Sequence, residues 1–93
     1  MKFVSNAKYD SPVESGTVFT TNVNGMKITI HRIIHLEGWY LSCYDLGING
    51  RELKAETIRD AIEESKGILK AAVARLEKTV EIFSNDSIEI SKY

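Results

Sequence analysis

The hydrophobic residues of this chain change their spacing near Ala55. From Thr17 to Ala55 they alternate with polar residues, in runs separated by glycine-containing turns, whereas from Ile58 to Phe83 they recur every third or fourth position without interruption. Alternation with a period of two is typical of a strand with one buried face, and the longer period is typical of an amphipathic helix. The sequence therefore predicts a sheet followed by one long helix.

Tight turns set the expected pairing of the strands. Asn24-Gly25 favours a type I′ hairpin turn, because both central residues of that turn need positive φ, and a second two-residue turn is expected at Glu37-Gly38. Placed independently, the two turns put one set of apolar side chains on a single face: Phe19, Val23, Met26, Ile28, Ile30, Ile34, Leu36, Trp39, Leu41 and Cys43. A slip by one residue would move that set to the other face, so the agreement supports the pairing.

A third turn is expected between Gly47 and Gly50. If this turn is a three-residue loop with Gly50 in the left-handed region, Leu53 and Ala55 return to the apolar face of the sheet. A two-residue loop at Asn49-Gly50 would instead put Leu53 on the other face. We favour the three-residue loop.

The helix is expected to begin at Thr57, because Asp60 follows three residues later in the spacing of a capping box. At about 100° per residue, one stripe along this helix is apolar: Ile58, Ala61, Ile62, Ser65, Leu69, Ala72, Val73, Leu76, Val80 and Phe83. About 26 residues rise roughly 39 Å, enough to cross the whole sheet. The apolar face of the sheet and the apolar stripe of the helix are expected to cover each other.

We therefore expect a two-layer α+β fold, in which an antiparallel meander of three to four strands packs on one long C-terminal helix. The 93 residues are expected to form a single domain. Within it we expect an irregular N-terminal segment at 1–16, the antiparallel sheet at 17–55 and the long helix at 57–83. A C-terminal tail or a short edge strand is expected at 84–93.

The charge balance argues against strong non-specific nucleic-acid binding. Twelve Lys and Arg against thirteen Asp and Glu give a net charge of −1, whereas such binding relies on an excess of positive charge. The first residues contain no long apolar run, which predicts neither a secretory signal nor a membrane span. The single cysteine, Cys43, excludes an internal disulfide and suits a reducing compartment. We therefore expect a cytoplasmic protein that does not bind a membrane.

The same pairing exposes a second sheet face that is aromatic and mildly basic, with His35 opposite Tyr40 and His31 opposite Tyr44. The candidate binding residues on this face are Lys27, His31, His35, Tyr40, Ser42 and Tyr44. Tyrosines are enriched as anchors in protein-binding surfaces, and on an open sheet they also stack single-stranded bases while Lys and His contact phosphate. The third interpretation is an ordinary solvated face, since Tyr and Thr are good strand residues.

A second candidate surface is a strip of small residues on the side of the helix opposite the apolar stripe. It consists of Gly67, Ala71 and Ala74. A glycine in the middle of a helix costs roughly 1 kcal/mol relative to alanine, and small residues let another backbone approach closely. A homodimer or a partner helix docked on this strip is one interpretation. The other is that alanine is simply a good helix former on an exposed surface.

No constellation in the sequence predicts catalysis or metal binding. His31 and His35, four residues apart on a strand, are separated by about 13 Å, too far to share one ion. Cys43 is expected to be a small core residue rather than an activated nucleophile. The sequence contains no phosphate-binding glycine loop and no zinc-ligand spacing. We therefore expect no catalytic residues, no metal and no cofactor.

Three stretches of the chain resemble the strand–strand–helix core of HicB-type antitoxins. They are Met26–Ile30, Gly38–Gly47 and Asp60–Glu64. In that family a strand ending in Asp-Leu-Pro-Gly precedes a helix that opens with an acidic-Ala signature, and the similar residues here are Asp45-Leu46-Gly47 and Asp60-Ala61. The resemblance implies a small protein that binds and neutralises a protein partner.

The function expected from the sequence is a non-catalytic protein-interaction module of the regulator or inhibitor type. The alternatives are a weak nucleic-acid-binding module that uses the aromatic sheet face, a HicB-like antitoxin, and a purely structural homodimer. Salt dependence separates the first two functions, because phosphate contacts weaken steeply with ionic strength whereas an aromatic protein interface does not.

Overall fold

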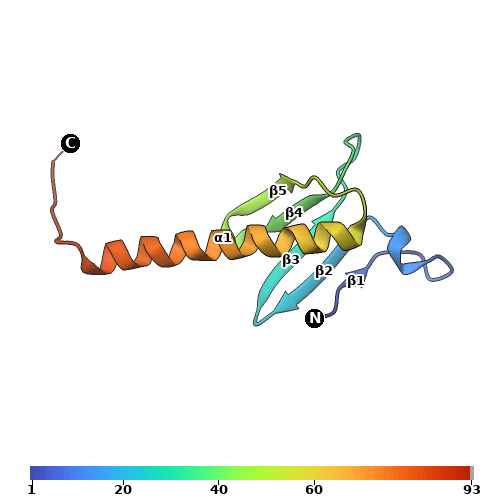
Figure 1. The fold of residues 1–93 in the computed structure, drawn as a ribbon, viewed down its shortest axis with the longest axis horizontal. Helices are drawn as coiled ribbons and strands as arrows, with labels where there is room; N and C mark the ends of the chain where they lie inside the picture. Colours follow the sequence, from blue (N-terminus) through green and yellow to red (C-terminus); the bar gives the residue numbers. More distant parts are fainter. Residues whose placement is uncertain (93) are drawn as a thin grey trace.

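A single antiparallel sheet and one long helix make up the structure, a computed structural model that describes residues 1–92 (Figure 1). The strands lie in chain order across the sheet: β1 (Val4–Ser5), β2 (Val18–Val23), β3 (Met26–His31), β4 (Tyr40–Cys43) and β5 (Ile48–Glu52). Helix α1 spans Ile58–Asn85 and packs on one face of the sheet. The expected α+β arrangement is confirmed, with five strands in place of three to four.

The β2–β3 hairpin has the expected turn and register. Asn24 and Gly25 both have positive φ, at 51° and 82°, and Phe19 pairs with Ile30. Alternate residues of the hairpin therefore face α1, and Phe19, Ile28 and Ile30 are buried there. Val23, at the end of β2, was expected in the core but is exposed.

The connection between β3 and β4 differs from the expected two-residue turn at Glu37-Gly38. Residues 32–39 form a longer loop, and Leu41 pairs with Ile30 instead of with Ile34. Compared with the expected pairing, the register of β3 against β4 differs by four residues. Because four is an even number, each residue that remains in a strand keeps its expected face of the sheet. Ile34 and Leu36 lie in the loop instead of in a strand, and both are exposed.

Contacts of Arg32 stabilise this longer loop. Its guanidinium lies 3.8 Å from the centre of the Trp39 ring, and its Nη1 donates to the carbonyl of Gly38 at 2.9 Å. These contacts join the two ends of the loop and use both the cation–π attraction and a charged hydrogen bond. A two-residue turn would have placed Arg32 inside a strand and away from this position.

The N-terminal segment is more ordered than expected. Val4 pairs with Thr20 on the outer edge of β2, and Asn6 fixes the strand there because its Oδ1 accepts the backbone N–H groups of Thr17 and Val18, at 2.7 and 3.0 Å. The unpaired backbone groups at a sheet edge favour such an addition. The segment at 1–16 therefore supplies an edge strand, which its irregular composition did not indicate.

A short 3₁₀ turn, Tyr44–Leu46, joins β4 to β5 and ends at Gly47 with φ 71°. The expected three-residue loop at 48–50 is not formed, because these residues belong to β5. Gly50 does have positive φ as expected, at 64°, and it lies next to a shift in the β4–β5 register. Leu53 returns to the core as expected and is 4 % exposed, whereas Ala55 is half-buried.

The core lies between the sheet and the first half of α1. Phe19 and Trp39 pack edge to face with their ring centres 5.6 Å apart, and the indole N–H of Trp39 donates to the carbonyl of Glu56 at 3.1 Å. Cys43 is a free, buried thiol, as expected. Thr57 caps the helix as predicted, since its hydroxyl accepts the N–H of Asp60 at 3.2 Å.

The expectation that the sheet covers the whole apolar stripe of the helix is wrong. The buried residues of α1 are Ile58, Ala61, Ser65 and Ala72, and every described residue from Val73 onward is exposed. Figure 1 shows the second half of α1 projecting beyond the sheet, in a molecule of 60 × 29 × 19 Å. Six-residue strands reach only about 20 Å, whereas a helix of 28 residues reaches about 42 Å.

Residues 87–92 form neither helix nor strand, so the edge strand considered there is not formed. Ile88 and Ile90 are exposed. The segment after α1 runs to the C-terminal end of the chain, and in Figure 1 it lies far from both edges of the sheet. A strand has no neighbour to pair with at that position.

Candidate functional site

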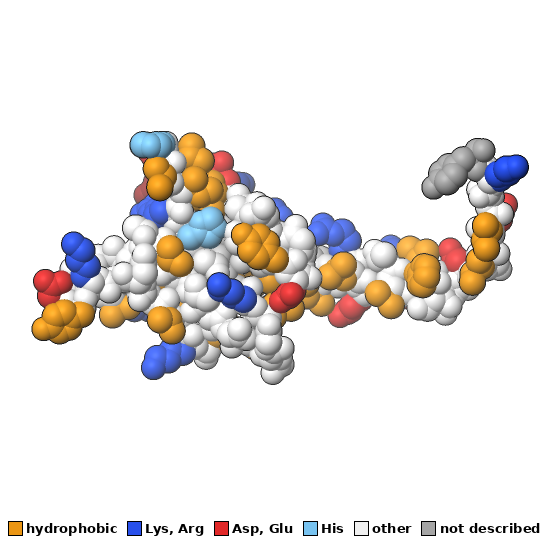
Figure 2. All heavy atoms as spheres, turned by 180° about the vertical axis from the view of Figure 1, so that it is seen from behind, with side chains coloured by type: hydrophobic (Ala, Val, Ile, Leu, Met, Phe, Trp, Pro, Cys, Tyr) orange, Lys and Arg blue, Asp and Glu red, His pale blue; other side chains and the backbone are white. Residues whose placement is uncertain are grey.

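The sheet face that points away from α1 contains a shallow hollow of about 260 Å³. Four of the predicted binding residues line it, namely Lys27, His31, Ser42 and Tyr44, together with Val18, Thr29 and Arg32. Figure 2, which views the molecule from behind Figure 1, shows hydrophobic, basic and histidine side chains scattered over this side rather than gathered in one large patch. Four of the six binding residues predicted from the sequence therefore lie together on one face of the sheet in the structure.

His31 and Ser42 connect three strands through hydrogen bonds. His31 Nε2 lies 2.8 Å from Ser42 Oγ, and His31 Nδ1 lies 3.0 Å from the carbonyl oxygen of Arg32. Because that oxygen only accepts, Nδ1 donates, and in the neutral ring Nε2 accepts the hydroxyl hydrogen of Ser42. Ser42 Oγ in turn accepts the N–H of Gly50 at 2.9 Å. The chain of bonds thus ties β3, β4 and β5 together.

A serine within hydrogen-bond reach of a histidine is also the geometry of a nucleophile and its base. Here Ser42 is buried, at 7 % exposed, and its oxygen is already engaged by Gly50. The described residues that line the hollow include no carboxylate that orients His31. We interpret the contact between His31 and Ser42 as part of the sheet's internal hydrogen bonding.

Tyr40 and His35 do not lie where the sequence predicted. Tyr40 is 7 % exposed, because the loop at 32–39 folds against it and its hydroxyl donates to the carbonyl of Glu37 at 2.9 Å. His35 lies in that loop with φ 68° and is not among the residues lining the hollow. The expected pairs His35–Tyr40 and His31–Tyr44 are wrong, and His31 pairs with Tyr40 instead.

The hollow therefore presents one exposed aromatic ring. Tyr44 is 74 % exposed, and it lies just beyond the end of β4. Binding of single strands by stacking uses successive bases on several rings. The burial of Tyr40 removes the second ring on which the nucleic-acid alternative depended.

The small-residue strip is exposed along α1. Gly67, Ala71 and Ala74 are all accessible, and a Cβ added at Gly67 would meet no atom within 4 Å. The strip is thus free to receive a partner, although nothing in its geometry distinguishes it from an ordinary alanine-rich helix surface. Its role as an interface stays a prediction.

A larger surface lies on residues that the sequence assigned to the core. We call this surface the overhang stripe, and it consists of Val73, Leu76, Val80 and Phe83. The exposed fraction rises along it from 38 % at Val73 through 43 % and 62 % to 85 % at Phe83. These residues continue the buried stripe of α1 past the end of the sheet. A comparison of the expected helix length with the length of the strands would have indicated this exposure, because the helix is about twice as long.

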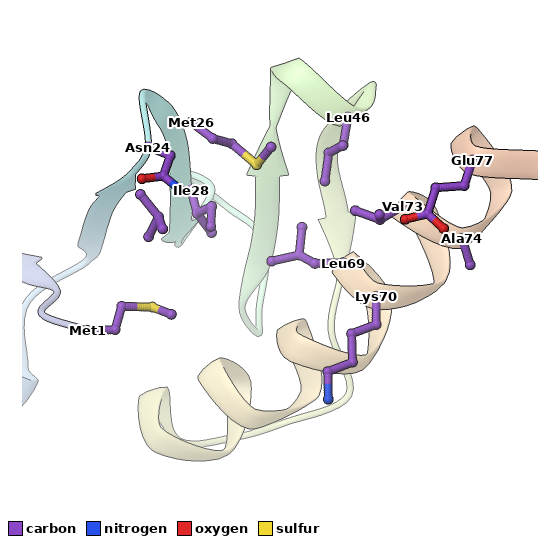
Figure 3. Close-up of a pocket in the computed structure, with 11 residues that line it drawn as sticks. Met1, Asn24, Met26, Ile28, Leu46, Leu69, Lys70, Val73, Ala74 and Glu77 are labelled. Carbon is purple, nitrogen blue, oxygen red and sulfur yellow. The ribbon is translucent and has the colours of Figure 1, made fainter. Parts of the chain in front are cut away.

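At the base of the overhang lies an apolar hollow of about 530 Å³. Its walls are Met26 and Ile28 from the β2–β3 hairpin and Leu69 and Val73 from α1. Figure 3 shows Leu69 and Val73 pointing from the helix toward the sheet, with Lys70 and Glu77 on neighbouring turns. The overhang stripe thus leads directly into a concave apolar surface.

Within residues 1–92, no group of three His, Cys, Asp or Glu side chains is arranged to hold a metal ion. No helix in this part of the chain is both long enough and apolar enough to cross a membrane.

No protein-family model, curated protein or solved structure matches this chain. The resemblance to HicB-type antitoxins accordingly stays a prediction from the sequence.

Proposed function

We propose that this protein is a non-catalytic interaction module, of the regulator or inhibitor type, that binds a protein partner through the overhang stripe of α1. The observation that supports this function is the row of four large apolar side chains that the described chain leaves uncovered. Phe83, at the far end, is 85 % exposed. The hollow around Tyr44 on the sheet is smaller and more polar than the apolar hollow beside Val73. We therefore place the main binding surface on the helix.

Single exposed apolar residues are ordinary on protein surfaces, but contiguous apolar patches mark interaction sites. Val73, Leu76, Val80 and Phe83 are three or four residues apart, so they share one side of the helix. This is the spacing with which an amphipathic helix enters an apolar groove or pairs with another helix. The apolar hollow extends the same surface toward the sheet.

The fold also prepares this surface for binding. The first half of α1 is held against the sheet by Ile58, Ala61 and Ala72, so the second half continues a helix that is already nucleated. A preformed helix loses less conformational entropy on binding than a segment that must fold first. The overhang is therefore a rigid surface for a partner.

A photo-crosslinking amino acid placed at Val80 tests this function in cells that express the full chain. The matched control carries the same amino acid at Lys78, which is exposed on the other side of the helix. We expect protein adducts at position 80 and few or none at position 78. Equal labelling at the two positions, or no protein adduct at either, would contradict the proposal.

A further inference from the structure

We propose that the partner on the overhang stripe is a second copy of this chain, paired antiparallel through the second halves of the two α1 helices. This inference rests on the proposed function, since it assigns an occupant to the same surface. Spacing, steric fit and buried area support it.

The stripe has the spacing of a two-helix seam. Leu69, Val73, Leu76, Val80 and Phe83 are separated alternately by four and three residues. That spacing is the heptad pattern in which side chains of one helix fit between those of another. An identical helix supplies a seam that matches in length and spacing.

The sheet decides the direction of pairing. In the first half of α1 the apolar stripe faces the molecule's own sheet, where Ile58, Ala61 and Ala72 are buried. Two parallel helices joined through their stripes would bring both sheets to the same end and between the helices. Antiparallel helices place the sheets at opposite ends, so only the two overhangs meet.

In this antiparallel pair the two-fold axis crosses the seam at the level of position 78 along the helix. It brings the protruding Phe83 of each copy to the apolar hollow of the other. Val73 and Phe83 lie about 15 Å apart along the helix, on either side of this axis. Val73 therefore faces Phe83 of the second copy, and Val73 is one wall of the apolar hollow. Each copy inserts its most exposed stripe residue beside the hairpin of the other, and both hollows are filled.

The charges beside the stripe both favour and oppose this arrangement. Lys70 and Glu81 lie on the same flank of the helix, and antiparallel pairing brings Lys70 of each copy toward Glu81 of the other, twice by symmetry. The same axis brings the two Glu77 side chains toward each other, once. It also places Glu77 of each copy about 3 Å along the helix axis from Glu81 of the other, twice by symmetry. The pairing therefore has two attractive and three repulsive contacts on this flank, and Glu77 takes part in every repulsive one, which makes it a diagnostic position.

The area indicates a reversible dimer. The four stripe side chains expose roughly 400 Å² per copy, so two copies with the rims of their hollows bury on the order of 1,000 Å², at the lower limit of specific interfaces. We expect a dissociation constant on the order of 1–100 μM. The chain is then a monomer when dilute and a dimer when concentrated.

Sedimentation equilibrium of the full chain across this concentration range measures the pairing. We expect Val80→Asp to abolish the dimer and Ala71→Asp, on the small-residue strip, to leave it unchanged. Val80 lies outside the core, so circular dichroism should show both variants folded. A wild-type monomer at concentrations up to about 1 mM overturns the inference, and so does loss of the dimer in Ala71→Asp alone.

Spin labels at single introduced cysteines determine the direction. Antiparallel pairing separates labels at Ser84→Cys by about 20 Å and labels at Gly67→Cys by more than about 30 Å. Parallel pairing would bring the Ser84→Cys labels to about 10 Å. The native Cys43 is 1 % exposed and is shielded from the label.

Removing the charge at Glu77 gives an independent check. If the two carboxylates approach each other across the axis, Glu77→Gln tightens the dimer about two- to fivefold. Glu63→Gln, on the covered half of the helix, serves as the control. Weaker pairing in Glu77→Gln contradicts the proposed axis.

The crosslinking experiment separates failure of this inference from failure of the proposed function. Suppose that the chain sediments as a monomer and that the adducts at position 80 contain only a different protein. This result rejects the pairing with a second copy but supports the proposed binding function. The absence of any protein adduct at position 80 rejects both.

Discussion

The carboxylate of Glu64 accepts the backbone N–H groups of Lys54 and Ala55, each at 2.9 Å. This side chain on α1 therefore holds the segment that leaves β5 and leads into the helix. It supplies acceptors to two backbone donors that belong to no strand or helix, and it sets where α1 begins relative to the sheet.

We expect Glu64→Ala to lower the free energy of unfolding by about 1–3 kcal/mol, because both donors lose a charged acceptor. Chemical denaturation measures the change. Glu63→Ala is the matched control: its carboxylate forms an exposed pair with Lys66 at 2.7 Å, which contributes at most about 1 kcal/mol. Equal effects of the two substitutions would show that the Glu64 contact does not stabilise the fold.

The β3–β4 register is tested by comparing two isoleucines. Ile30 is 0 % exposed and pairs with Leu41, whereas Ile34 is 82 % exposed in the loop. We expect Ile30→Ala to cost about 2–5 kcal/mol and Ile34→Ala about 0.5 kcal/mol or less. Thermal and urea unfolding distinguish the two, and a large cost at Ile34 would favour the two-residue turn instead.

Ser42→Ala should loosen the centre of the sheet. The substitution removes the acceptor of the Gly50 N–H and the partner of His31 Nε2, so we expect a loss of about 1–3 kcal/mol. Amide hydrogen exchange at Gly50 should accelerate more than exchange in β2. Ser84→Ala, on the exposed end of α1, is the control. Unchanged exchange at Gly50 is the result that rejects this role.

Two glycines are expected to respond in opposite directions to alanine. Neither Gly67 nor Gly25 has an atom within 4 Å of an added Cβ, but Gly25 has φ 82°. We expect Gly67→Ala to stabilise the helix by about 0.5–1 kcal/mol and Gly25→Ala to destabilise the hairpin by about 1–2 kcal/mol. Melting temperatures measure both. A Gly67→Ala variant with weaker self-association would identify the small-residue strip as the interface.

Much of the candidate site on the sheet followed from alternation alone. Lys27, His31 and Ser42 share a face because a register change by an even number of residues leaves every side chain on its side. The sequence could not show that Tyr40 is buried. That burial depends on the loop that covers it, and the two ends of this loop are joined by the contact of Arg32 with Trp39.

The sequence by itself determined the period of the sheet region and of the helix, the turn at Asn24-Gly25, the cap at Thr57 and the apolar side of β2, β3, β4 and α1. These features follow from interactions between residues that are near in the chain. The tertiary structure decided which part of each apolar side is covered. Coverage depends on how far the sheet extends beneath α1, so Ala72 is buried and Phe83 is exposed although both continue one stripe.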